Sequence, residues 1–296
     1  MSVDKTESLI VSAKECFKPY QERIDMLFEK DIVERYGAGE VIDACRYVFC
    51  SGGKKLRPSI VYSIAQALDP DVDVDKIALA IELFQVVTLV VDDLPCMDND
   101  DMRRGKPSLH KAFSEKMAIF VSYSLVAHAY SLIQEAPTPR GKEAYCVLKE
   151  AIAHASSVMG YPGVVLGGYV DMCDREYTED EIHVLVDRKT GALLELAFVF
   201  GWLYGGGDIE KLERVKEMAK YFGRAFQYAD DIDDEEQDRR VGNKANFVLA
   251  FGIDATRAMV RSCMERFLDI ARELGVEKTP IARFAKAAGE VVGLGA

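Results

Sequence analysis

Two aspartate-rich segments of this 296-residue chain have the composition and spacing of a metal site. They span residues 91–101 and 226–234, and each follows a stretch of apolar residues. In the second segment Asp230 and Asp234 are four residues apart, so on a helix both carboxylates lie on one face, where like charges repel each other. A divalent cation between them reverses the sign of that interaction. Oxygen ligands in an open site favour Mg²⁺, which binds a few carboxylates together with substrate phosphates.

The first segment reaches a similar arrangement by another route. Asp92 and Asp98 are six residues apart and would lie on different faces of an unbroken helix. Pro95 lies between them and disfavours a continuous helix, so we predict a loop that returns Asp98 towards Asp92. One acidic run alone is more often a solvated loop or a helix cap. Two runs 138 residues apart, both following apolar stretches, favour a paired metal site.

Basic residues occur near both acidic segments and upstream of them. Mg²⁺ can bridge phosphate oxygens, arginine binds them in a fork, and lysine adds a point charge. The combination therefore predicts a site for a phosphate chain, although each basic residue alone is more often surface charge. The candidates are Lys54, Arg57, Arg103, Arg104, Lys189 and Lys244.

The elements that carry these residues are predicted to be helices, because apolar residues recur at three- and four-residue spacing almost throughout. The β-branched stretch 86–91 resembles a buried strand, but its neighbours are helical and no partner strand is evident. We therefore predict a single all-α domain of about ten helices over residues 1–296. The expected helices cover residues 5–34, 38–50, 57–68, 75–94, 110–135, 142–171, 178–204, 208–236 and 254–274.

Composition narrows the range of partners. The chain carries 37 Lys and Arg against 49 Asp and Glu, a net charge of −12, which argues against nucleic acid and anionic membrane surfaces as partners. No apolar run reaches about 18 residues, so we expect no transmembrane segment. Seven cysteines without a CxxC pair indicate reduced thiols, and together with the lack of a visible signal peptide they predict a cytoplasmic location.

Four segments in order resemble the trans-isoprenyl diphosphate synthases, over about residues 40–250. They are GGKKLRP from Gly52, DDLPCMDNDDMRRGKPSLH from Asp92, RKTGALLE from Arg188 and FQYADDIDD from Phe226. The resemblance implies an antiparallel helix bundle around a deep central cavity, the isoprenoid synthase fold. It also implies head-to-tail condensation of isopentenyl diphosphate with an allylic diphosphate, three Mg²⁺ ions when diphosphate is bound, and a homodimer.

The resemblance also assigns roles to residues by motif match. Asp92, Asp98 and Asp230 would bind Mg²⁺, supported by Asp93, Asp231 and Asp234. The allylic diphosphate would meet Arg103, Lys189 and Lys244, and isopentenyl diphosphate would meet Lys54, Arg57, Gln85 and Arg104. Thr190 and Gln227 would lie near the reacting carbon. No side-chain base is implied, because the diphosphate takes the proton. The implied catalytic set is Asp92, Asp98, Arg103, Lys189, Thr190, Gln227, Asp230 and Lys244.

Product length is implied by the residues that precede the first acidic segment. Val87 and Thr88 stand where a large aromatic residue in this family stops elongation early. Their small size, with the two-residue insertion in DDLPCMD, implies a twenty-carbon product, geranylgeranyl diphosphate. A fifteen-carbon product, farnesyl diphosphate, stays open because other residues along the cavity can close it.

Several positions depart from the family pattern. Val91 replaces a histidine and Tyr169 replaces a glutamine, while either Asp171 or Asp174 could join the metal shell. The loop after Asp234 is shorter than usual and lacks one basic and one acidic residue. A weakly active enzyme or a non-catalytic subunit of a heteromeric synthase is therefore an alternative. A terpene cyclase is disfavoured because the basic residues for isopentenyl diphosphate are present, and a helical scaffold would not explain the apolar approach to both acidic segments.

Overall fold

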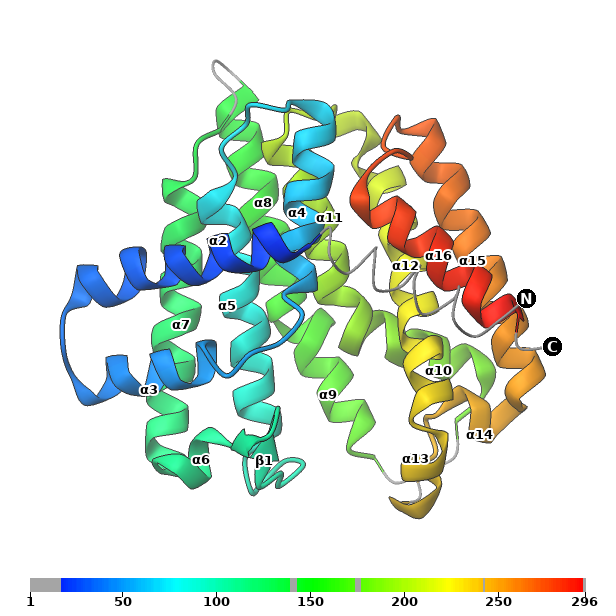
Figure 1. The fold of residues 1–296 in the computed structure, drawn as a ribbon, viewed down its shortest axis with the longest axis horizontal. Coiled ribbons are helices and arrows are strands. Elements are labelled where there is room, and N and C mark those ends of the chain that lie inside the picture. The colour runs from blue at the N-terminus through cyan, green and yellow to red at the C-terminus, as the bar shows by residue number, and fades with distance from the viewer. Residues whose placement is uncertain (1–16, 139–142, 174–176, 242, 295–296) are drawn as a thin grey trace.

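The computed structural model describes residues 17–138, 143–173, 177–241 and 243–294, which are almost entirely helical. Long helices lie side by side in a bundle, and neighbours mostly run in opposite directions (Figure 1). The predicted all-α fold is confirmed. The main helices of the bundle are α4 (Leu56–Leu68), α5 (Asp75–Asp92), α7 (Glu115–Glu135), α8 (Glu143–Met159), α11 (Ala192–Tyr204), α12 (Leu212–Asp233) and α15 (Ile253–Glu273).

Helix α11 forms the centre of the bundle. All of its residues except Glu195 are buried, and it contacts α4, α5, α8 and α12. A helix that is apolar on all sides must be covered on all sides, which explains this central position. Stretch 86–91 lies within α5, as the helical character of its neighbours predicted.

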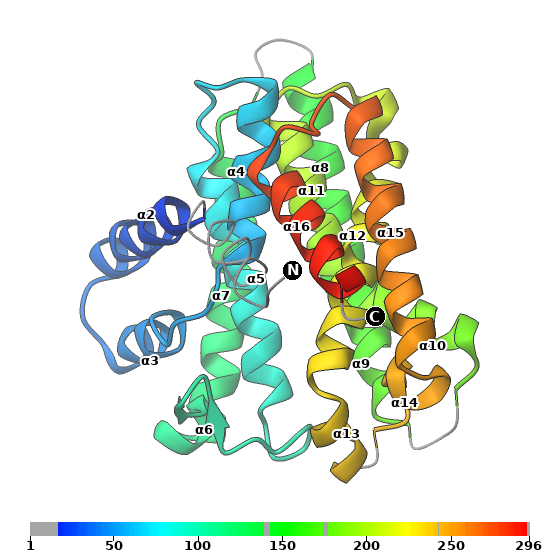
Figure 2. The same cartoon turned by 45° about the vertical axis from the view of Figure 1, so that its right-hand side comes forward.

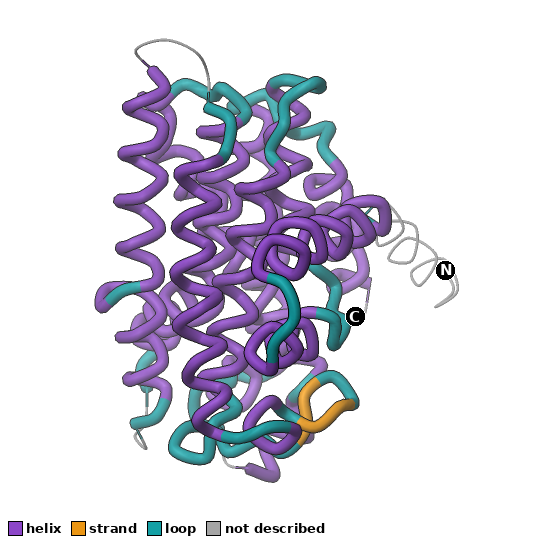
Figure 3. Tube along the Cα trace, turned by 90° about the vertical axis from the view of Figure 1, so that its left-hand side faces the viewer, coloured by secondary structure: helices purple, strands orange, loops and turns teal. Residues whose placement is uncertain are grey.

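Other helices pack around the bundle. Helices α2 (Lys18–Phe28) and α3 (Glu40–Phe49) cross its outer side, linked through the π-helical turn η1 (Glu29–Glu34), and Figure 2 shows them projecting from the bundle. Helix α16 (Pro280–Leu294) packs on α15 and α4. Connecting segments gather at the two ends of the long helices (Figure 3).

Both acidic segments lie at the same end of the bundle. Helix α5 ends at Asp92 and α12 ends at Asp233, and these ends point the same way in Figures 1 and 2. The shared end also carries the strands β1 (Met102–Arg103) and β2 (Lys106–Pro107), and the helices α6 (Leu109–Ala112), α9 (Leu166–Asp171) and α13 (Glu235–Val241). The antiparallel bundle therefore brings together segments that are far apart in sequence.

Several expected helices are divided. Ser114 accepts a hydrogen bond from the Met117 backbone N–H (3.1 Å) and begins α7, which separates it from α6. Gly160, Pro162 and a non-helical Gly163 separate α8 from α9. The turn between α8 and α9 is η2 (Tyr161–Val165). Two further short turns are η3 (Asp187–Gly191), between α10 (Glu179–Val186) and α11, and η4 (Ile209–Lys211), before α12.

The β1–β2 hairpin and the helices α14 (Phe247–Phe251) and α16 were not predicted. The hairpin turn places Arg104 at φ 53° and Gly105 at φ 77°, the left-handed conformations that a two-residue hairpin turn requires. Gly105 is usual in such a turn, but Arg104 gave no signal for it.

Helix α7 is the single described helix long and apolar enough to cross a membrane by length and composition. It packs along α5 and also contacts α3, α6 and α8, as a core helix of a bundle does. Its outer face nevertheless exposes Ile119, Phe120 and Tyr123.

Candidate active site

The first acidic segment folds back on itself where the sequence predicted a loop. Helix α5 ends at Asp92, and the backbone N–H of Asp98 donates to the Asp92 carbonyl oxygen (2.9 Å). Burial raises the pKa of Asp92 to about 6; nearby Lys189 opposes this shift and Asp98 reinforces it. The two aspartates therefore form a region of concentrated negative charge beside a lysine.

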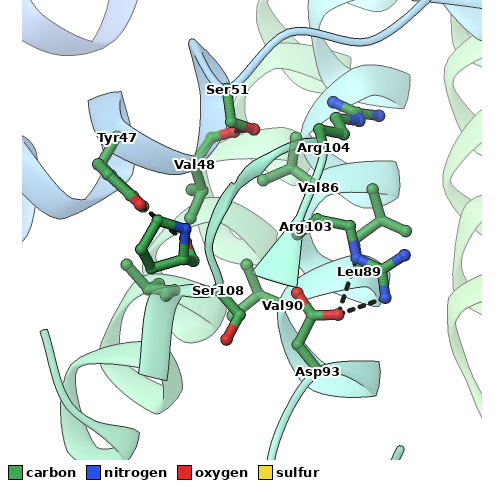
Figure 4. Close-up of a pocket in the computed structure, with 12 residues that line it drawn as sticks. Tyr47, Val48, Ser51, Val86, Leu89, Val90, Asp93, Arg103, Arg104 and Ser108 are labelled. Carbon is green, nitrogen blue, oxygen red and sulfur yellow. Dashed lines mark hydrogen bonds and ion pairs between the residues drawn. The ribbon is translucent and has the colours of Figure 1, made fainter. Parts of the chain in front are cut away.

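Asp93 has a different environment from its neighbour Asp92. It is buried, and one carboxylate oxygen accepts hydrogen bonds from both Nε (2.8 Å) and Nη2 of Arg103 (Figure 4). Arg103 Nη2 also donates to Asp100 (2.8 Å). The hairpin that carries Arg103 and Arg104 is thereby tied to the end of α5.

The second acidic segment closes α12. Burial raises the pKa of Asp230 to about 6; the charge of Lys54 lowers it and that of Asp234 raises it. Asp234 is exposed at the helix end. Its pKa is also raised, first by the partial loss of solvent around it and then by the negative charges of Asp238 and Asp233. Each acidic segment thus presents one half-buried carboxylate with a raised pKa and one exposed carboxylate.

Asp231 parallels Asp93 because it is buried and already accepts hydrogen bonds from the protein. One oxygen accepts from Gln227 Nε2 (2.9 Å) and the other from the backbone N–H of Phe247 (2.9 Å). Gln227 in turn accepts a hydrogen bond from the Thr190 hydroxyl (2.6 Å). Thr190 and Gln227, predicted to lie near the reacting carbon, are therefore in direct contact.

Lys189 connects a third segment to the site. It lies in η3 and forms an ion pair with Asp171 at the end of α9. Burial lowers the pKa of Lys189, but the charge and hydrogen bond of Asp171, followed by the charges of Asp92 and Asp98, outweigh burial and raise it. Of the two alternatives for an extra acidic residue, Asp171 lies beside this lysine, and Asp174 lies outside the described residues.

Arg224 holds η3 against α12, a contact that the sequence did not predict. Its guanidinium binds both carboxylate oxygens of Asp187, at 2.7 and 2.8 Å. Asp187 is the first residue of η3, so the pair anchors the turn that carries Lys189 and Thr190. The residues of the pair are 37 positions apart, and no local pattern links them.

A group of cations lies between α4, α5 and the hairpin. Within the described residues, Nε of Arg57 and Oε1 of Gln85 are buried without a hydrogen-bond partner. Burial lowers the pKa of Arg57 to about 10; Glu82 opposes this effect, Arg104 adds to it and Asp230 opposes it. Glu82, also not predicted, is buried within apolar α5 and offsets this positive charge. The available signal was an acidic residue in the apolar interior of α5, away from Asp75 and Asp92 at its two ends.

The remaining predicted residues differ in exposure. Lys54 and Lys244 are exposed, and Lys244 lies between α13 and α14. Val87 is buried in the core, whereas Thr88 is half-buried and its hydroxyl donates to the Gln85 carbonyl (2.9 Å).

The carboxylates present fit Mg²⁺. Among the described residues, no three His, Cys, Asp or Glu side chains lie close enough to enclose a metal ion alone. Mg²⁺ requires few protein ligands because it keeps waters and binds substrate phosphates. Asp92 and Asp230 are carboxylates whose charge is disfavoured by burial, which a cation would offset.

Comparisons with known proteins agree with this arrangement. Residues 39–250 match the polyprenyl synthetase family. The chain is 32% identical to farnesyl diphosphate synthase of Geobacillus stearothermophilus over 276 residues, covering 85% of this chain and 92% of that protein. It is 31% identical to geranylgeranyl pyrophosphate synthase 4 of Arabidopsis thaliana over 73% of this chain, and it spans 61% of that longer protein.

Solved structures support the same assignment. The crystal structure of an FPP/GFPP synthase from Zymomonas mobilis has a TM-score of 0.79 and 29% identity, and the match covers 96% of this chain and 99% of that one. The helix bundle, the paired acidic segments and the sequence matches all indicate the same family. This chain therefore belongs to the polyprenyl synthetase family and is a trans-prenyltransferase that elongates isoprenoid chains.

Proposed function

We propose that this chain joins isopentenyl diphosphate head-to-tail to an allylic diphosphate in a reaction that depends on Mg²⁺. The allylic C–O bond breaks and its electron pair leaves with the diphosphate. The alkene of isopentenyl diphosphate then forms the new C–C bond with the allylic cation, and the released diphosphate takes the proton. The observation that carries this proposal is that Asp92 and Asp230, on helices α5 and α12 that end at the same end of the bundle, have pKa values raised to about 6 beside cationic side chains.

The aspartates divide into two kinds in this proposal. Asp92, Asp98, Asp230 and Asp234 would hold Mg²⁺, three ions when diphosphate is bound, which would offset negative charge that grows on the leaving diphosphate. Asp93 and Asp231 would support them, because their carboxylates already accept hydrogen bonds from Arg103 and from Gln227.

The cationic side chains would bind and orient the two diphosphates. Lys189, whose pKa is raised in part by the charges of Asp92 and Asp98, would bind the allylic diphosphate together with Arg103 and Lys244. A second group would bind isopentenyl diphosphate. It includes Nε of Arg57 and Oε1 of Gln85, which are buried without a hydrogen-bond partner and could bond a polar ligand. The members of this second group are Lys54, Arg57, Gln85 and Arg104.

The direct test is an assay with isotope-labelled isopentenyl diphosphate and allylic primers of five, ten and fifteen carbons, followed by chromatography of the extracted products. We expect products with Mg²⁺ and none after chelation, with activity restored by added Mg²⁺. No condensation with any primer would contradict catalysis and favour the non-catalytic subunit. That alternative rests on the shortened segment after Asp234 and on Tyr169. The intact acidic and basic sets favour the active enzyme.

We further propose a twenty-carbon product, with farnesyl diphosphate as the competing outcome. Thr88 lies one helical turn before Asp92, and Phe84 lies one turn before Thr88 on the same face. Phe84 is fully buried and its ring packs on Tyr130 at 5.3 Å, so it would close the cavity below Thr88.

Substitutions at these two positions should change product length in opposite directions. We expect Thr88→Phe to shift products towards fifteen carbons or fewer, because its ring would block the tail one turn earlier. Phe84→Ala should lengthen products by removing the floor. Mass spectrometry of dephosphorylated products measures both, and unchanged products in both variants would exclude these positions as the determinants.

Assembly and location complete the proposal. The exposed Ile119, Phe120 and Tyr123 of α7 support a homodimer that covers this apolar face.

Free thiols at the six described cysteines fit a cytoplasmic location, which fractionation of cells that express the protein would test.

A further inference from the structure

Asn246 is a buried residue between α13 and α14 whose side-chain hydrogen-bonding groups are all engaged. Its Nδ2 donates to the main-chain oxygen of Asp231 (3.0 Å) and to the carboxylate of Asp238 (2.8 Å). Its Oδ1 accepts from the backbone N–H of Leu249 (3.1 Å). Asp231 contributes one of the last four carbonyls of α12, so Asn246 caps the end of α12 and the start of α14 together.

The next residue strengthens this junction. The backbone N–H of Phe247 donates to the Asp231 carboxylate (2.9 Å). The Phe247 ring is buried against Tyr228 of α12 and His183 of α10, with centroid distances of 4.7 and 5.6 Å. Two consecutive residues are thus fixed to α12 by polar and apolar contacts.

Asp231 is also connected to the candidate active site by hydrogen bonds. The second oxygen of Asp231 accepts from Gln227, and Gln227 accepts from Thr190. Lys244 lies two residues before Asn246, in the exposed segment that leads into the junction. Only Ala245 separates Lys244 from Asn246, whose side chain is held by three hydrogen bonds. A displacement of Asn246 must therefore displace Lys244.

We propose that Asn246 is a positioning residue that acts through Lys244. Its amide anchors the shortened segment after α12 and so places the Lys244 ammonium group for the allylic diphosphate. Because Asn246 is bonded to the main chain of Asp231, this anchor keeps the segment that carries Lys244 at the end of α12.

A pair of Asn→Asp variants tests the role. Asn246→Asp keeps the oxygen that caps α14 but loses the N–H donors to Asp231 of α12 and to Asp238 of α13, and it adds a charge beside Asp238. Asn243→Asp is the matched control, because Asn243 is exposed and its oxygen accepts from the Ala245 backbone N–H (3.0 Å), which aspartate can also do.

We expect Asn246→Asp to lower kcat by about 10- to 100-fold. The KM for isopentenyl diphosphate should stay within about threefold of wild type, because the groups proposed to bind it lie on other segments. Asn243→Asp should retain wild-type kinetics. In a Lys244→Ala background, Asn246→Asp should cause little further loss, since the residue through which it acts is already gone.

Two results would overturn the inference: wild-type kcat in Asn246→Asp, or an equal proportional loss with and without Lys244. Circular dichroism and thermal unfolding establish that each variant is folded. If Asn246→Asp does not fold, Asn246→Ser takes its place, since serine keeps a capping oxygen without added charge and should lower kcat in the same direction.

The inference rests on the proposed function, and the two can fail separately. A wild-type chain that condenses no primer contradicts the proposed function. An active wild-type chain whose Asn246 variants behave like Asn243→Asp contradicts the positioning role alone.

Discussion

Adjacent aspartates in this chain have unequal environments. Asp93 and Asp231 accept hydrogen bonds from protein donors, and in Asp231 these bonds oppose the rise in pKa that burial causes. Burial raises the pKa of Asp92 and Asp230 to about 6. A buried carboxylate without sufficient donors favours its neutral form, so in the metal-free protein the charged form costs stability near neutral pH. Each pair thus couples a residue held by the protein with one that a cation would stabilise.

Replacing Asp92 should separate stability from activity. We expect Asp92→Asn to raise the unfolding free energy of the metal-free protein by about 1–3 kcal/mol at pH 7, because the amide removes a half-buried charge. The same variant should lose nearly all prenyl transfer. Chemical denaturation and the product assay measure the two effects. Asp101→Asn, an exposed control in the same loop, should change stability by less than about 0.5 kcal/mol. A destabilised Asp92→Asn would contradict the cost of burial.

The raised pKa values also predict opposite pH dependences. Below about pH 6 Asp92 and Asp230 take up protons, so kcat/KM should fall by at least about tenfold per pH unit. The folded-state pKa of about 6 exceeds the usual aspartate value of 3.8, so the destabilisation is full above pH 6 and disappears as pH falls towards 4. The stability gap between Asp92→Asn and wild type should therefore narrow from pH 7 to pH 5 in a denaturant series. A constant gap would show that Asp92 titrates normally.

The contacts between secondary-structure elements determine where the polar groups meet. Pro95 ends the helical run of α5, and the return of Asp98 to the Asp92 carbonyl followed from that local signal. The π-helical turn η3 has no comparable signal. It is held by Asp187 to Arg224 of α12 and lies against α9 at Gly167. This packing fixes the positions of Lys189 and Thr190, which lie in η3.

A glycine pair in α9 tests this packing. A Cβ atom added at Gly167 would lie 2.9 Å from the backbone nitrogen of Lys189, whereas one added at Gly168 meets nothing within 4 Å. We expect Gly167→Ala to destabilise the protein by about 1–3 kcal/mol and to reduce activity, because the clash is with the backbone of η3. Gly168→Ala should gain up to about 1 kcal/mol from its higher helix propensity. Thermal unfolding compares them, and equal stabilities would show that α9 shifts freely.

Among the described residues, helix α7 leaves an apolar face uncovered. Helix α7 packs within the bundle on one side and exposes Phe120 and Tyr123 on the other. Neither the charge nor the composition of the chain favours an anionic membrane as the covering partner. A second copy of the chain is the partner that the family resemblance implies.

Charged substitutions on this face should dissociate the proposed dimer. We expect wild type to elute as a dimer with light-scattering detection, and Phe120→Glu with Tyr123→Glu to give monomers, because an interface cannot bury unpaired carboxylates. Met26→Glu, on the equally exposed outer side of α2, should remain a dimer. A monomeric wild type, or a dimeric double variant, would contradict the assignment.

Much of the architecture followed from local pattern. Apolar spacing identified the long helices, including the β-branched end of α5, because helix formation depends on neighbours within a few turns. Breaks at Ser114 and Gly163 were missed, since the periodicity continues across them. The hairpin was missed because Arg104 adopts a left-handed conformation that its residue type does not favour.

The sequence by itself determined the kinds of groups in the site and their order along the chain. Carboxylates, arginines and lysines keep their chemistry wherever they lie, and four ordered motifs indicated the family. Tertiary packing alone decided which carboxylate is bonded to the protein and which is available, that Thr190 meets Gln227, and that Asn246 joins α12 to α14. These contacts join residues from separate elements, and their formation depends on how whole helices pack, information that no short stretch of sequence contains.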